Sequence, residues 1–283
     1  MTKGPHPGFE QGMERHLNWF TILLNKIFGG AANALLAAVH VHPNDPAYPI
    51  PNFVAGTIAV CLIAMIFFLW LRPRISVDRP GATQQVMEAL LTNSMGVGIR
   101  DLLDDNVEHH ARQYLPMVGS VAIFILFANA ISVLPAFESP TGHPSVPLAC
   151  AIHTFAYYNM AGLKEHGPLG YAKHFAGPVW WLSWLIFPVE IISHTARLLS
   201  LTVRLWANIF ASELIYVIFL GLFIAPAVTV GHAHPLLGYA LGIFPAVIPI
   251  AFIALHLFVA VIQAFVFTIL PALYIGMATA EEH

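Results

Sequence analysis

The chain has 283 residues, of which 58% are hydrophobic and only 10% are charged. Soluble globular domains carry about 25% charged residues, so this composition excludes an ordinary soluble domain and indicates an integral membrane protein. The net charge of −3 offers no basic surface for nucleic acid, and the two cysteines lack CxxC or metal-binding spacing.

Residues 1–52 are predicted to form an N-terminal segment on the outer side of the membrane. Within it, residues 15–42 mix apolar residues with Gly29-Gly30 and many alanines, which predicts a surface or partly inserted helix. Three prolines in residues 44–52 then predict a loop.

Residues 53–176 are predicted to contain the peripheral transmembrane helices. Apolar runs predict membrane spans over residues 53–71, 114–134 and 148–163. Between the first two, residues 81–103 place apolar side chains at helical spacing, which predicts an amphipathic helix along the inner membrane surface.

The distribution of basic residues predicts the orientation. The connection 72–112 contains five arginines and the connection 164–176 contains two lysines, whereas residues 135–147 and 225–235 contain neither. Because cytoplasmic loops are enriched in Lys and Arg, we place the N-terminus outside and the C-terminus inside. Five membrane segments satisfy that alternation.

Residues 177–283 are predicted to form a long antiparallel hairpin. No Gly or Pro interrupts residues 189–220, which predicts a helix about 48 Å long. A hydrocarbon core is about 30 Å thick, so this helix would tilt by roughly 50°, beyond the usual range. A turn is predicted around residues 226–235, followed by an apolar segment that Pro245 and Pro249 interrupt.

The predicted long helix carries a polar stripe. At 100° per residue, four side chains fall within about 40° of one another: Glu190, Arg197, Arg204 and Asn208. Arg197 either snorkels to the interface or faces a polar path. Snorkelling fits Arg204 less well, since no Lys or Arg follows it in the chain. An arginine at mid-membrane costs ~2.5–3.5 kcal/mol and usually marks an ion pathway.

The stripe lies in a recognisable motif. Residues 200–214, SLTVRLWANIFASEL, resemble the signature of subunit a of F-type ATP synthases, which usually reads S-L-x-x-R-L-F-G-N-x-x-A-G-E. The stretch from His256 to Gln263 matches the family as well, with the same seven-residue step. The resemblance covers most of the chain, is most specific from Glu190 onward, and implies an all-α protein of a bacterial inner membrane that translocates protons for ATP synthesis.

One antiparallel register brings the polar residues of the hairpin into two pairs. Residues that face each other on antiparallel helices have numbers with a constant sum. Arg204 with Gln263 gives 467, and Glu213 with His256 gives 469. We therefore expect Arg204 and Gln263 at one depth, both able to reach the surface of the hairpin, and Glu213 beside His256.

The resemblance implies a role for each of these side chains. Two offset half-channels would carry protons to and from the carboxyl groups of a rotating c-subunit ring, with Arg204 as the barrier between them. Glu213 and His256 would line the outer path, with a hydrogen-bonded core histidine as the alternative for His256. Asn208 either orients Arg204 or serves helix packing.

The inner path would be lined by Glu190, Ser193 and His194, with snorkelling of the Glu190 carboxylate as the alternative. The outer loop departs from the family pattern P-T-x-D-x-N-x-T, because residues 140–147 read PTGHPSVP. His143 is therefore the candidate replacement for the acid, and Ser145 the candidate replacement for the amide.

The resemblance also implies partners: the c-ring, peripheral-stalk b subunits and membrane lipid. No cofactor is expected, and the absence of a GxxxxGK[ST] motif assigns ATP chemistry to other subunits, so the chain itself is not an enzyme. The alternatives are a stand-alone proton channel or secondary transporter, and a membrane b-type haem protein suggested by 15 histidines. The sequence leaves open whether the ion is H⁺ or Na⁺.

Overall fold

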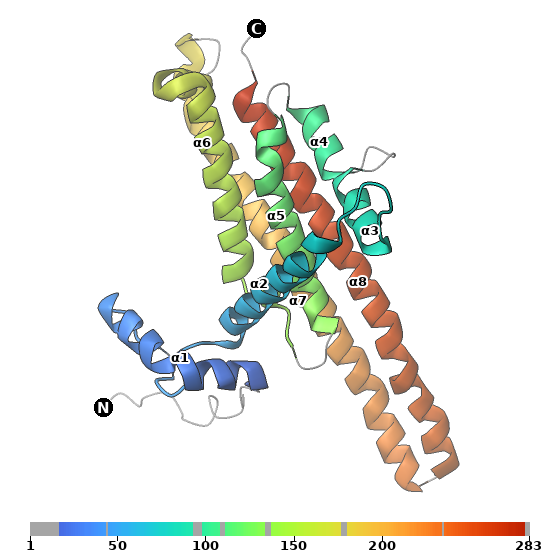
Figure 1. Ribbon diagram of the computed structural model, residues 1–283. Helices are drawn as coiled ribbons and strands as arrows, with labels where there is room; N and C mark the ends of the chain where they lie inside the picture. The colour runs from blue at the N-terminus through green and yellow to red at the C-terminus, as the bar shows by residue number, and fades with distance from the viewer. Residues whose placement is uncertain are drawn as a thin grey trace, which may run out of the picture.

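The computed structural model describes residues 17–43, 45–92, 98–107, 111–133, 137–176, 180–233 and 235–280. Every regular element within these residues is helical, as Figure 1 shows, which confirms the predicted all-α class. The α-helices are α1 (Trp19–Ala38), α2 (Asn52–Leu71), α3 (Ala82–Leu91), α4 (Ile99–Asn106), α5 (Ala111–Ala130), α6 (Ser145–Ala176), α7 (Ser183–Ala233) and α8 (Pro235–Thr279).

Five of the described helical segments are long and apolar enough to cross a membrane, which confirms an integral membrane protein. They are Trp19–Ala38, Asn52–Arg74, Ala111–Val133, Ser183–Phe219 and Ile250–Thr279. The N-terminal helix α1 is thus apolar enough to span, where the sequence predicted a surface or partly inserted helix. In Figure 1, α1 lies across the direction in which α5 to α8 run.

The predicted third span, residues 148–163, lies within α6 but is not among these five. Polar side chains such as those of His153 and Asn159 lower the hydropathy of α6, although the helix packs against α7 and α8. Gly167 adopts a φ of 69° and precedes Pro168, which explains the kink inside α6. The crossing of the membrane by α6 stays a prediction.

The predicted amphipathic helix over residues 81–103 is wrong in one respect, because two helices occupy this stretch. α3 ends at Leu91, where Thr92 adopts an extended conformation. α4 begins at Ile99 after Gly98, which is also extended. Thr is β-branched and Gly is a poor helix former, so neither residue favours continuation of the helix next to it.

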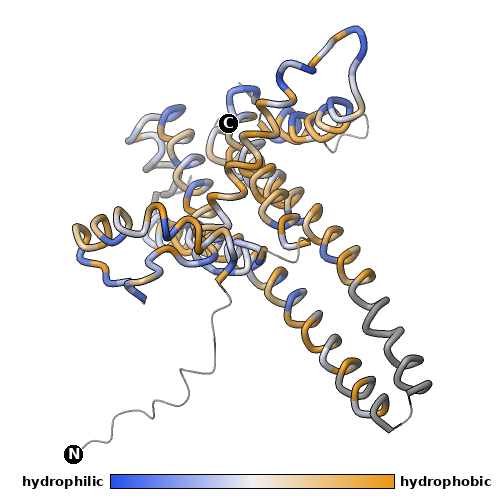
Figure 2. Tube along the Cα trace, turned by 60° about the horizontal axis from the view of Figure 1, so that its bottom comes forward, coloured by the Kyte–Doolittle hydropathy of each residue, from blue (hydrophilic) through white to orange (hydrophobic). Residues whose placement is uncertain are grey.

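The two last helices form the predicted antiparallel hairpin and are the longest elements (Figure 1). Both exceed their predicted lengths: α7 runs past Pro226 to Ala233, and α8 continues through Pro245 and Pro249. Prolines are tolerated in membrane helices because few backbone groups are freed and neighbours can satisfy them. Figure 2 shows mostly hydrophobic residues along the described parts of this hairpin.

α5 packs against the middle of the hairpin. A buried cluster joins Ile125 of α5 to Leu205 and Ile209 of α7 and Phe267 of α8, each with no exposed surface. At the other end of α5, Gly276 of α8 lies so close to α4 that a Cβ would overlap a backbone carbonyl of α4. These contacts fix the depth at which polar residues of the hairpin meet their neighbours.

Candidate functional site

A first polar cluster, here called the outer cluster, surrounds His256 of α8. Its Nδ1 is 3.1 Å from the hydroxyl of Ser212 on α7. Its Nε2 is 3.1 Å from the backbone carbonyl of Asn129 near the end of α5. The same nitrogen is 2.7 Å from the hydroxyl of Ser132 in the 3₁₀ helix η2 (Ile131–Val133), which follows α5. The half-buried imidazole therefore joins three helical segments.

The Asn129 side chain extends the outer cluster into the short 3₁₀ helix η3 (Pro140–Gly142). The Thr141 hydroxyl donates to Asn129 Oδ1 and lies 2.6 Å from the hydroxyl of Ser139, which donates to the Ala128 carbonyl. Asn129 and Thr141 have no exposed surface, and Ser139 is 5% exposed. Asn129 Nδ2 has no hydrogen-bond partner in the described structure.

Glu213 of α7 faces the same 3₁₀ helix. A Cβ added at Gly142 would lie 3.3 Å from Glu213 Oε2, so only a glycine leaves normal space for the carboxylate here. The backbone amide of Ser139 faces this carboxylate, and Glu138 lies close enough to interact with it electrostatically. His143, the next residue, is exposed and stacks on Phe53 with ring centroids 3.9 Å apart.

The predicted antiparallel register holds to within one residue. Ser212 faces His256, and their numbers sum to 468, between the two predicted sums. The predicted direct pair is not formed, because no hydrogen bond in the described part of the chain joins Glu213 to His256. Successive residues of a helix point about 100° apart, so Ser212 faces α8 while Glu213 turns to η3.

The predicted pairing of Arg204 with Gln263 at one surface is wrong for Gln263. Arg204 is exposed, and its Nη2 is 3.5 Å from the hydroxyl of Ser200. Asn208, one turn further, is exposed as well. Gln263 is only 2% exposed, and its Oε1 has no hydrogen-bond partner in the described structure. The two side chains thus lie in different surroundings.

A second polar cluster, here called the inner cluster, lies near the start of α7. Glu190 Oε1 is 3.3 Å from His194 Nε2 and 3.7 Å from Arg197 Nη2. The other ring nitrogen of His194 is 3.0 Å from the hydroxyl of buried Tyr158 on α6. The Arg197 guanidinium lies over the ring of Tyr274 on α8, 5.4 Å from its centroid.

The predicted residues Glu190 and His194 are therefore in contact, while Ser193 is half-buried beside them on α7. Arg197, which the sequence left between two roles, pairs with Glu190 rather than pointing away from the protein. Within the described residues, no group of three or more His, Cys, Asp or Glu side chains could hold a metal ion.

The sequence interpretation missed several members of the two clusters: Asn129, Ser132, Ser139, Thr141 and Tyr158. A signal for Asn129 was present, since it is an amide inside an apolar span, where polar side chains usually have a function or a partner. No local pattern distinguishes the hydroxyl residues, because their partners come from distant parts of the chain.

Known proteins match this chain in sequence over the segments that carry the two polar clusters. The family model described as ATP synthase A chain matches residues 54–276. The ATP synthase subunit a of Koribacter versatilis (strain Ellin345) is 38% identical over 268 residues, which are 95% of this chain and 99% of that protein. The subunit a of Solibacter usitatus (strain Ellin6076) is 38% identical over 261 residues, which are 92% and 100% of the two chains. The chain with these two polar clusters along a long helical hairpin thus belongs to the ATP synthase A chain family.

Proposed function

We propose that the chain is the proton-translocating stator subunit of the membrane sector of an F-type ATP synthase. The observation that carries this proposal is the spacing of polar groups along α7. Arg197 of the inner cluster and Ser212 of the outer cluster lie seven and eight residues from Arg204, or about 11 and 12 Å along the helix. The exposed arginine is therefore midway between two separate polar clusters.

The outer cluster supports proton transfer because it accommodates both states of His256. Ser132 and Ser212 also donate to the backbone carbonyls of Asn129 and Ile209, at 2.9 and 2.8 Å. Their oxygens can then accept from both N–H groups of a charged imidazole. When the ring is neutral, the Ser212 hydroxyl can turn and donate to Nδ1. A histidine held in this way is suited to relay protons near neutral pH.

Glu213 provides the carboxylate of the outer path, at the border between η3 and α7. Protons entering by the outer loop would reach Glu213 first and His256 next, which lies across Ser212. The exposed position of His143, one residue from Gly142, is consistent with a place at the entrance. In this chain a histidine and hydroxyl groups would replace the acid and amide common in the family.

Arg204 would separate the outer path from the inner path. Its guanidinium stays charged, and a positive charge nearby lowers the pKa of a carboxyl group by ~1–3 units. A carboxyl group of a c-ring would lose its proton as it reaches Arg204 and regain one from the outer path as it leaves. The exposed position of Arg204 leaves the guanidinium accessible to such a partner. The membrane potential would supply ~2.3 kcal/mol per charge per 100 mV.

The inner cluster would accept the released proton. Glu190 and His194 are in contact, and Tyr158 holds the other side of the imidazole, so a proton can pass between a carboxylate and a histidine there. This path opens to the cytoplasm if the C-terminus is inside, as the basic loops predict. Peripheral-stalk b subunits would hold the chain against the ring, and ATP chemistry would occur on other subunits.

Replacement of Arg204 tests the proposal in the intact complex. We expect Arg204→Ala to abolish ATP synthesis driven by a proton gradient in reconstituted vesicles, while the subunit still inserts and assembles. Arg100→Ala is the matched control, since Arg100 pairs with Asp104 on α4 and belongs to neither polar cluster. Normal synthesis in the Arg204 variant would refute the proposal. If the chain purifies without a ring of small acidic subunits, a stand-alone channel or transporter would be favoured instead.

A further inference from the structure

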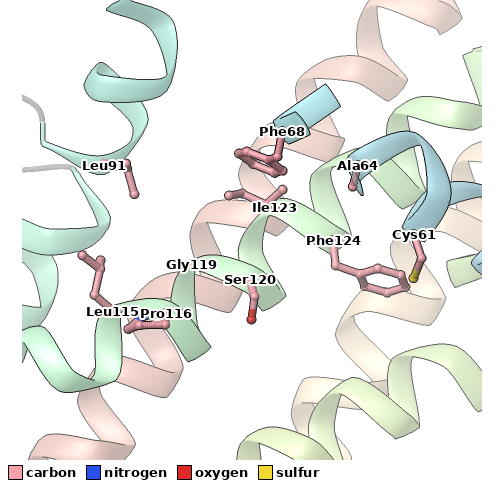
Figure 3. A pocket seen from close by; sticks show the side chains of 10 residues that line it. All are labelled: Cys61, Ala64, Phe68, Leu91, Leu115, Pro116, Gly119, Ser120, Ile123 and Phe124. Atoms are coloured by element: carbon pink, nitrogen blue, oxygen red, sulfur yellow. The ribbon is translucent and has the colours of Figure 1, made fainter. Parts of the chain in front are cut away.

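A cavity of about 520 Å³ lies between α2, α3 and α5 (Figure 3). This volume is within the range of ligand-binding pockets in proteins. Carbon atoms form nearly all of its wall: Ala64 and Phe68 of α2, Leu91 of α3, and Ile123 and Phe124 of α5. Neither polar cluster contributes a side chain to it, so the proton path does not explain this cavity.

Gly119 of α5 is one of the residues that line the cavity. A Cβ added at this residue would meet nothing within 4 Å, although Gly119 itself is buried from solvent. Glycine inside a helix is less stabilising than alanine, and no neighbouring helix requires the glycine here. The open space beside Gly119 is therefore available to a bound molecule.

Two arginines continue the lining at one end of the cavity. Arg72 follows Phe68 by four residues, and Arg112 precedes Leu115 by three, spacings that place side chains on one helix face. Figure 3 shows Leu91 and Leu115 at one end of the cavity and Cys61 and Phe124 at the other. By their spacing from Phe68 and Leu115, the two arginines follow the lining toward the end with Leu91. Both are exposed, and neither forms an ion pair with a described carboxylate.

Other charged groups nearby are already engaged. The Arg74 guanidinium lies over the Trp70 ring, 4.2 Å from its centroid, and donates to the Trp70 carbonyl. The Glu88 carboxylate, one turn before Leu91 on α3, accepts a hydrogen bond from the Gln84 side chain at 2.7 Å. Arg72 and Arg112 thus provide two exposed positive charges that form no ion pair with a described carboxylate.

We propose that this cavity binds an acyl chain of an anionic phospholipid, whose phosphate group contacts Arg72 and Arg112. From Leu115 to Phe124 the wall extends about 14 Å along α5, close to the thickness of one leaflet of hydrocarbon. Apolar walls match an acyl chain, and guanidinium groups match a phosphate. The surrounding membrane supplies this ligand at high concentration, whereas a helix of another subunit would have to bring acidic groups to the same place.

Photo-crosslinking in the intact complex tests the proposal. The complex is placed in nanodiscs that contain phosphatidylglycerol or phosphatidylcholine with a photoactivatable group on one acyl chain, and the labelled peptides are quantified. We expect phosphatidylglycerol to label residues 61–68 and 115–124 at least about fivefold more than phosphatidylcholine, since one arginine near an anionic lipid contributes about that factor. Equal labelling by the two lipids would overturn the proposal. It would also be overturned if a helix of another subunit, and not lipid, were found in the cavity.

Matched variants separate the two parts of the site. Gly119→Phe fills the cavity and should remove labelling by both lipids. The double variant Arg72→Gln with Arg112→Gln keeps the cavity and should lower phosphatidylglycerol labelling to the phosphatidylcholine level. Arg79→Gln removes an exposed arginine outside the lining and should change neither. If Gly119→Phe fails to assemble, the double arginine variant decides alone, and undiminished phosphatidylglycerol labelling in it would refute the proposal.

Discussion

Replacement of Thr141 by valine tests whether the outer cluster is held together by its buried hydroxyl groups. Valine keeps the branched shape of threonine and has a methyl group in place of the hydroxyl. That hydroxyl contacts the Asn129 amide and lies 2.6 Å from the Ser139 hydroxyl. All three side chains are buried, so no solvent can replace the lost bonds.

The expected loss of stability follows from the hydrogen bonds that the valine variant lacks. Leaving one buried polar group unsatisfied costs about 1–3 kcal/mol. Asn129 would lose the bond to its Oδ1, whereas Ser139 keeps its bond to the Ala128 carbonyl and loses less. We expect Thr141→Val to lower the free energy of unfolding by about 2 kcal/mol. If that energy holds η3 and Glu213 in place for proton transfer, the rate of proton translocation should fall by up to roughly 30-fold.

Two measurements check this expectation: thermal stability of the purified complex, and ATP-driven acidification of membrane vesicles. Thr141→Ser is the control, because it keeps the hydroxyl and loses only a methyl group. Both quantities should decrease in the valine variant and stay close to the wild-type value in the serine variant. The reasoning is refuted if valine and serine give the same stability and the same rate.

Three further predictions concern other contacts. Single apolar replacements of Glu213 and His256 should each slow proton translocation, and the double variant should lose less than the sum; additive losses would show independent roles. Tyr158→Phe removes the hydroxyl that lies 3.0 Å from His194. It should slow proton release on the inner side and lower the free energy of unfolding by about 0.5–1.5 kcal/mol; unchanged ATP synthesis would contradict this. Gly276→Ala should destabilise the subunit, because the new Cβ overlaps the α4 backbone, and a normal melting temperature would argue against this close packing.

The sequence predicted the hairpin because its signals are local and periodic. An uninterrupted apolar helix and a constant residue sum were enough to bring Ser212 and the region of Glu213 to the depth of His256. The errors came from contacts with other parts of the chain. Gln263 lies close to Arg204 in the antiparallel register, but its side chain is buried. Spacing along one helix does not reveal which face other helices cover.

Local sequence rules also failed to predict where the helices end. Proline was taken as an interruption at Pro226, Pro245 and Pro249, as it would be in a soluble helix. In a membrane no water competes for the backbone, so helices continue through such positions. The opposite error occurred in residues 81–103, where an amphipathic pattern was taken as continuous although Gly98 separates two short helices.

The two clusters also explain why the shorter helices α5 and α6 carry polar side chains. A polar side chain on α7 or α8 is stable in a membrane only if a neighbouring segment offers it a partner. Asn129 near the end of α5 and Ser132 just after it are partners in the outer cluster, and α6 carries Tyr158 for the inner cluster. Polar side chains lower the hydropathy of α6, and such side chains can also provide hydrogen-bond partners for polar residues of the hairpin. The long helices set the depth of the charged groups, and α5, α6 and η3 stabilise those groups there.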